Sequence, residues 1–125
     1  MERFTVRSTD LGSEMVDDEL LIIDFVTNRY YCLNATASTV WDLISATPRS
    51  VDEVAARLAA AYGCPIDDVH RDADDLLRAL VDEGLLVRTN DQTDTPIDDL
   101  AVSAPYVVPR FEKFGTLDQL MLAGE

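Results

Sequence analysis

The only histidine of this sequence, His70, lies among aspartates at spacings that could build a metal site. Asp67 and Asp74 are three residues before it and four residues after it, so a helix would place the three side chains on one face. Imidazole and carboxylate groups are common ligands of Zn²⁺. An Asp-rich helix also brings such groups together by chance, and a solvated acidic face is the simpler interpretation. We therefore expect no metal ion, and no other cofactor.

Catalytic arrangements are equally hard to build from these residues. A single histidine does not provide a recognisable Ser-His-Asp or Cys-His arrangement, and the sequence has no glycine-rich phosphate loop. Cys32 and Cys64 are far apart and carry no pairing motif, which is typical of free thiols in a reducing cytosol. The N-terminus lacks the basic and apolar regions of a secretory signal. We expect a cytoplasmic protein that is not an enzyme and has no catalytic residues.

The net charge of −14 over 125 residues is the strongest constraint from composition. So acidic a surface repels nucleic-acid phosphates and anionic membranes, and it favours neutral or basic partners. The longest apolar stretches, such as Leu20 to Ile23, have the length of a strand and are too short to span a membrane. These features argue against nucleic acid and membranes as partners.

Two β-rich stretches predict an antiparallel hairpin. Residues 20–25 and 29–33 are rich in aliphatic and aromatic side chains. Between them, Asn28 can adopt the positive φ that a tight turn requires. Residues 1–18 alternate only weakly, and we expect one short strand there. Together these segments predict an N-terminal three-stranded antiparallel sheet.

Three helices are predicted after the hairpin. Asn34 is a candidate N-cap for the first helix, and Ser50 with Glu53 forms a capping box for the second. Gly63 is expected to end the second helix in a left-handed conformation. The third helix is predicted from about Ile66 to Glu83, followed by a short strand. Their apolar stripes face the core, to which they contribute Trp41, Leu58, Leu76 and Leu80 among others; on the third helix the inward-facing residues are Val69, Ala73, Leu76, Leu77, Leu80 and Val81.

This order predicts an α+β fold that resembles a winged helix-turn-helix with its sheet placed first. The helix in the DNA-recognition position argues against DNA binding, because a duplex carries about one negative charge per 1.7 Å of axis. An acidic winged-helix regulator therefore remains only as a weaker alternative. The helix carries seven acids against two arginines: Asp67, Asp68, Asp72, Asp74, Asp75, Asp82 and Glu83 against Arg71 and Arg78.

The composition divides the chain into three parts. Residues 1–88 form the predicted domain, and residues 89–105 read as an acidic flexible linker of Asp, Thr, Asn and Pro. Aromatic and aliphatic residues return in residues 106–125, where a disordered tail would not need them. Arg110 and Lys113 are cations in this tail, and the acidic third helix is the surface they are expected to face.

The stretch from about Glu19 to Arg88 resembles the PqqD-like family, which comprises recognition elements of ribosomally made, post-translationally modified peptide (RiPP) pathways. The resemblance rests on the end of the hairpin, on parts of the first two helices and on the closing strand. These are Tyr30-Tyr31-Cys32-Leu33-Asn34, Ala37, Thr39 to Trp41, Ser50-Val51-Asp52-Glu53-Val54 and Glu83-Gly84-Leu85-Leu86.

This resemblance implies a non-catalytic domain that binds a leader peptide as an added strand against its third strand and third helix. The leader would then be delivered to a maturation protease, cyclase or radical enzyme. The residues expected to line the groove are Arg29, Tyr30, Tyr31, Cys32, Leu33, Val69, Asp72, Ala73 and Leu76.

The tail is similar to the leader pattern of lasso-peptide precursors. That pattern is a Tyr, two residues, a Pro, one residue, a Leu-like side chain, and then a Gly. The matching residues, with a further aromatic, are Tyr106, Pro109, Phe111, Phe114 and Gly115; Phe111 stands where leaders commonly have Leu. After Leu122 only Ala123-Gly124-Glu125 follows, so we expect a leader-like ligand without a core peptide.

Two hypotheses follow for the tail. In the first, it occupies the domain's own groove, either in cis or exchanged between two chains, so that the protein is a monomer or a tail-swapped dimer. In the second, it docks a separate modifying enzyme. For the first we expect the tail to pair with Arg29 to Leu33, with Tyr106 and Phe111 as its main anchors.

Overall fold

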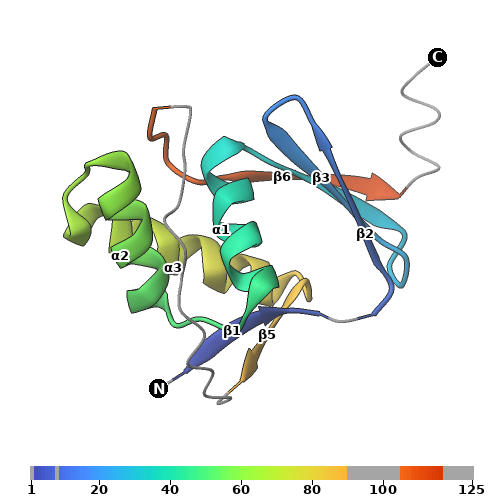
Figure 1. Ribbon diagram of the computed structural model, residues 1–125. Helices are drawn as coiled ribbons and strands as arrows, with labels where there is room; N and C mark the ends of the chain where they lie inside the picture. Colours follow the sequence, from blue (N-terminus) through green and yellow to red (C-terminus); the bar gives the residue numbers. More distant parts are fainter. Residues whose placement is uncertain (1, 8, 90–104, 117–125) are drawn as a thin grey trace.

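The computed structural model describes residues 2–7, 9–89 and 105–116, which form an α+β architecture (Figure 1). One antiparallel sheet has the order β2-β3-β4-β6, and a separate antiparallel pair joins β1 to β5. The strands are β1 (Arg3–Val6), β2 (Leu11–Val16), β3 (Glu19–Asp24), β4 (Arg29–Leu33), β5 (Leu86–Thr89) and β6 (Phe111–Thr116). The helices are α1 (Ala35–Ala46), α2 (Val51–Tyr62) and α3 (Ile66–Asp82). The predicted fold class is therefore confirmed.

The strand count differs from the prediction. Residues 1–18 were expected to hold one strand, and this is wrong, because they contain both β1 and β2. β1 buries Phe4 and pairs with β5, whereas β2 has no buried residue and pairs with β3. Because so few of their side chains are buried, apolar and polar residues alternate only weakly in this part of the sequence. The sequence therefore does not show that it holds two strands. The predicted sheet corresponds to β2-β3-β4, to which β6 adds a fourth strand.

The local signals for turns and caps are confirmed. Asn28 has a φ of 61° in the turn between β3 and β4. Asn34 accepts a hydrogen bond from Ala37 N–H at 2.9 Å and starts α1, and Ser50 Oγ accepts one from Glu53 N–H at 3.2 Å and starts α2. Gly63 ends α2 with a φ of 68°. The side chains of Asn34 and Ser50 accept hydrogen bonds from amides that the first helical turn leaves without a partner.

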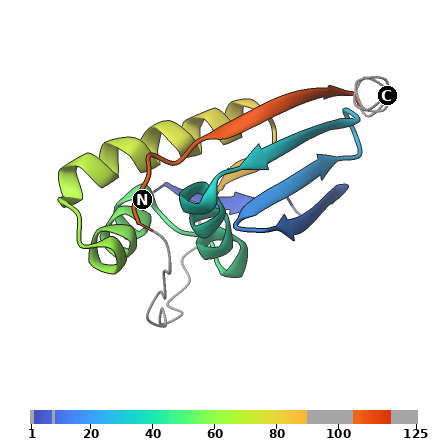
Figure 2. The same cartoon turned by 90° about the horizontal axis from the view of Figure 1, so that it is seen from above.

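The hydrophobic core lies between the inner face of the sheet and the three helices (Figure 2). All four side chains predicted for the core, Trp41, Leu58, Leu76 and Leu80, are buried. The apolar stripe of α3 also predicts that Val69, Ala73, Leu77 and Val81 face inward; the first three are buried and Val81 is partly buried. None of the helices in the described ranges has the length and apolar character that a membrane span requires.

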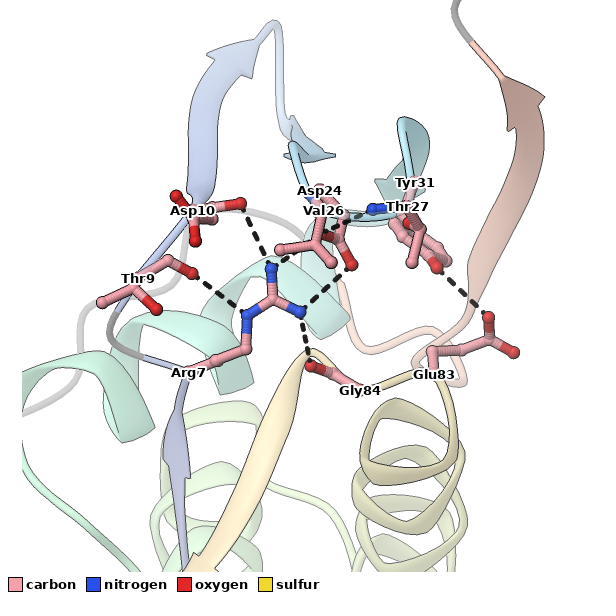
Figure 3. Close-up of polar contacts among 9 residues, drawn as sticks. All are labelled: Arg7, Thr9, Asp10, Asp24, Val26, Thr27, Tyr31, Glu83 and Gly84. Atoms are coloured by element: carbon pink, nitrogen blue, oxygen red, sulfur yellow. Dashed lines mark hydrogen bonds and ion pairs between the residues drawn. The ribbon is translucent and has the colours of Figure 1, made fainter.

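A polar network around Arg7 joins segments that are far apart in sequence (Figure 3). The guanidinium donates to Asp24 Oδ1 at 2.7 Å, to the Thr9 and Asp10 carbonyls, and to the Gly84 carbonyl at 3.1 Å. The Asp24 side chain is fully buried. The hydrogen bond from Arg7 lowers the pKa of Asp24 to about 2, against the effect of burial. This network fixes the β3–β4 hairpin against the turn that follows α3.

Candidate functional site

The candidate site is the edge of β4 that faces away from β3, together with the adjoining surface of α3. In the structure β6 lies along this edge, on the side of α3 (Figure 2). Tyr31 is opposite Lys113 and Leu33 is opposite Phe111 in the antiparallel register. The register shifts between Arg29 and Tyr30, where Gly115 is the additional residue of β6.

The backbone contacts continue beyond the strand into residues 105–110. Asn34 N–H donates to the Arg110 carbonyl at 3.0 Å, and the Asn34 side chain donates to the Val108 carbonyl at 2.9 Å. Val107 N–H donates to Thr36 Oγ1 at 3.3 Å. Pro109, which has no N–H to offer, is buried among these contacts just before β6. Asn34 therefore caps α1 with one side-chain atom and holds the tail with another.

Phe111 fills the inner side of the site. Its ring meets Tyr31 edge to face, with centroids 6.1 Å apart, and it packs against the core. Tyr31 and Leu33, which point to the same side of β4, are buried. Aromatic pairs in this geometry contribute about 0.5–1.5 kcal/mol beyond their buried area.

Tyr106 is held at the far end of the site by α2 and α3. Its hydroxyl donates to Asp72 Oδ2 at 2.7 Å, and its ring meets Tyr62 edge to face with centroids 5.3 Å apart. Burial and the hydrogen bond to Asp72 raise the pKa of Tyr106 well above 10.0, its ordinary value. The phenol is therefore a neutral donor to a carboxylate, a strong kind of hydrogen bond.

Glu83 directly follows the last residue of α3, as its C-cap. Its carboxylate accepts from the Tyr31 hydroxyl at 3.2 Å, as Figure 3 shows, and pairs with Lys113 Nζ at 3.1 Å. Burial and the charge of Glu83 raise the pKa of Tyr31. The prediction that the tail's cations face acidic α3 is confirmed for Lys113; Arg110 is exposed.

The outer side of β4 carries different chemistry. Tyr30 stacks on Phe114 with centroids 4.6 Å apart and an interplanar angle of 6°. Cys32 donates to Glu19 at 3.1 Å; burial and that carboxylate raise the pKa of the thiol to about 11, so the thiol is protonated at neutral pH. These groups border a hollow of about 560 Å³ lined by Val16, Asp17, Asp18, Glu19, Leu21, Tyr30, Cys32 and Phe114.

The predicted groove residues thus fall into four groups. Tyr31, Leu33 and Asp72 contact the inner side of the tail, and Tyr30 and Cys32 lie on the outer side of the sheet. Arg29 is exposed at the register shift. Val69, Ala73 and Leu76 are core residues of α3.

Sequence reasoning did not assign four residues to this site: Asn34 and Glu83, named there for other reasons, and Thr36 and Tyr62. Of these, Thr36 is a polar residue in the first turn of α1 that the fold buries fully, which the sequence alone does not mark. The predicted linker, apart from Thr89 and Pro105, and the tail beyond Thr116 lie outside the described residues.

The acidic surface of α3 carries no metal site among the residues that the structure describes, which contain no group of three or more suitable His, Cys, Asp or Glu side chains. His70 Nε2 lies 2.7 Å from Asp52 Oδ1, so its nearest acidic partner is on α2 and not on its own helix.

Comparisons with known proteins agree with this architecture. The family model described as Coenzyme PQQ synthesis protein D (PqqD) matches residues 19–86, from β3 to the start of β5. A solved structure described as TbiB1 in complex with the TbiA(beta) leader peptide is similar with a TM-score of 0.60 and 28% identity. The similarity covers 72% of this chain and 99% of that one. None of the curated proteins matches the chain.

Proposed function

This chain belongs to the PqqD family, and from that premise we propose that its domain binds the leader segment of a ribosomally made precursor peptide as a strand added to β4. The bound leader is presented to a separate maturation enzyme, of the lasso-peptide type, in the cytoplasm. The domain contributes binding and no catalytic group. The solved relative is described as a complex with a leader peptide, which supports a leader peptide as the ligand of this fold.

The observation that carries the proposal is the placement of β6. An extended segment pairs with the free edge of β4 while its side chains enter sites on both faces, which is how strand addition combines affinity with specificity. Tyr106, Pro109 and Phe111 are each buried or half-buried against the domain, at the spacing of the leader-like pattern.

In this proposal the tail is a tethered competitor for the leader. From Arg88 to Tyr106 a chain can extend roughly 60 Å, compared with a domain radius of gyration of about 13 Å, so it can reach its own groove or that of a second copy. A tether of this kind gives an effective concentration on the order of millimolar. A leader in solution then binds when the tail is displaced.

The test is a calorimetric titration with a synthetic peptide of residues 105–116. We expect micromolar binding to a chain that ends at Thr89 and binding at least about tenfold weaker to the full chain, since the tethered copy competes. A peptide with Ala in place of Tyr106 and Phe111 is the matched control, and circular dichroism checks that the shortened chain is folded. Equal affinity for both chains would show that the tail does not compete for the site.

A second role for the tail, docking of a separate modifying enzyme, is favoured by its exposed aliphatic residues. Val107 and Val108 are 45% and 44% exposed beside the anchored Tyr106 and Pro109. Val107→Ser with Val108→Ser should weaken capture of the purified maturation enzyme and leave peptide titrations unchanged. A loss of tail protection in hydrogen exchange would instead assign the two valines to the groove.

A further inference from the structure

Strand addition alone does not fix which residue of a ligand lies opposite which residue of β4. The ladder hydrogen bonds are made by the backbone, so a slip of two residues keeps the same side chains facing inward and preserves the pairing. Side-chain contacts must therefore select the register, and two of them are made by Asp72 within α3 and by Glu83, which directly follows this helix.

The first contact is Glu83, whose position is fixed by the fold and not by the tail. Its carboxylate accepts from the buried Tyr31 hydroxyl, and the next residue, Gly84, has a φ of 80° and accepts from Arg7 through its carbonyl (Figure 3). Lys113 lies opposite Tyr31 in the register, so its ammonium reaches this carboxylate from the inner side of β6.

The second contact is Asp72, which accepts from the Tyr106 hydroxyl. Asp72 and Glu83 are eleven residues apart, about three helical turns or roughly 16 Å along α3. Tyr106 and Lys113 are seven residues apart in the tail, which spans at most about 23 Å when extended. A slip of two residues would move the cation by about 7 Å, beyond the reach of Glu83.

We propose that Asp72 and Glu83 form a two-point gauge on α3 that selects leaders carrying a Tyr and, seven residues later, a Lys or Arg. This inference rests on the proposed function and adds the ligand's charge pattern to it. Ligands with an acidic residue at the second position would place two carboxylates together and be rejected. The gauge also fixes the direction of the bound strand, because one end of the ligand must provide a tyrosine hydroxyl and the other a cation.

A charge exchange in the full chain tests the gauge. The variants are Glu83→Lys, Lys113→Glu and the double variant, with Arg110→Glu as a control that changes the tail's charge equally at an exposed site. Hydrogen exchange of the amides of residues 111–114 reports tail occupancy, and exchange in α3 reports whether the domain is folded. We expect each single reversal to lower tail protection about three- to tenfold, the double variant to recover to within about twofold, and the control to change it less than about twofold.

The outcomes separate the gauge from the proposed function. Glu83→Gln removes the charge and keeps a hydrogen-bond acceptor for Tyr31, and it should lower tail protection about two- to fivefold. It replaces Glu83→Lys as the test if that variant disturbs α3. Wild-type tail amides that exchange at random-coil rates would overturn groove occupancy itself. If the wild-type tail amides are protected but the losses of protection in Glu83→Lys and Lys113→Glu multiply in the double variant, only the gauge is overturned.

Discussion

Replacement of Tyr106 by Phe isolates one hydrogen bond of the site, because it removes the hydroxyl and keeps the ring. The hydroxyl lies 2.7 Å from Asp72 Oδ2, and hydrogen bonds to charged groups contribute about 1.5–3 kcal/mol. The ring contact with Tyr62 should survive, since its geometry depends on the ring alone. We therefore expect Tyr106→Phe to increase opening of the tail about ten- to a hundredfold while the domain stays folded.

The assay is hydrogen exchange at β6 and at the core of α3, measured on the wild type and on Tyr106→Phe. Tyr106→Ala provides the upper limit, because it also removes the aromatic contact, worth about 0.5–1.5 kcal/mol. Tail protection in Tyr106→Phe equal to that of the wild type would refute the reasoning about Asp72. A loss of α3 protection in the same variant would show that the hydroxyl supports the domain and not the tail.

The raised pKa of Tyr106 adds a pH dependence with a definite sign. A group whose pKa is higher in the docked state than in the free state contributes stability that is complete below the free-state pKa, here 10.0. That contribution decreases as the pH rises above this value towards the pKa of the docked state. Tail protection, compared between wild type and Tyr106→Phe at the same pH, should therefore converge above about pH 10.

Further predictions concern the domain and its thiol. Leu76→Ala should lower the free energy of unfolding by about 2–5 kcal/mol in thermal denaturation, whereas Phe111→Ala should release the tail with a native far-ultraviolet spectrum. Asp24, with its pKa lowered to about 2, should contribute stability that is complete above about pH 4 and is lost as the pH falls through 2; Asp24→Asn should remove about 2 kcal/mol at pH 7 in urea denaturation. Cys32, with a pKa of about 11, should react with iodoacetamide at pH 7.5 far more slowly than a free cysteine, and Glu19→Gln should accelerate the reaction.

The elements that the sequence predicts well are those whose causes are local. Asn34, Ser50 and Gly63 determine helix ends through atoms within a few residues, and these positions match the structure. The core side of α3 is equally clear, because its buried residues recur at the helical period.

What escapes the sequence depends on contacts between distant segments. The strands β1 and β2 bury few side chains of their own and are defined by their partners, β5 and β3. Glu83 is one of many acids in the chain, and its relation to Tyr31 and Lys113 exists only after the helix, the hairpin and the tail have come together. The spacing of residues along the chain does not predict such a contact between distant segments.

The register shift between Arg29 and Tyr30 has a consequence for the kinetics of ligand exchange. A bulge interrupts the ladder, so we expect the C-terminal end of β6 to open first. An entering peptide can pair with β4 at this opened end. It can then extend its pairing one hydrogen bond at a time while β6 is displaced. Exchange by this route is bimolecular, and its rate rises with the concentration of the entering peptide instead of being limited by complete release of the tail.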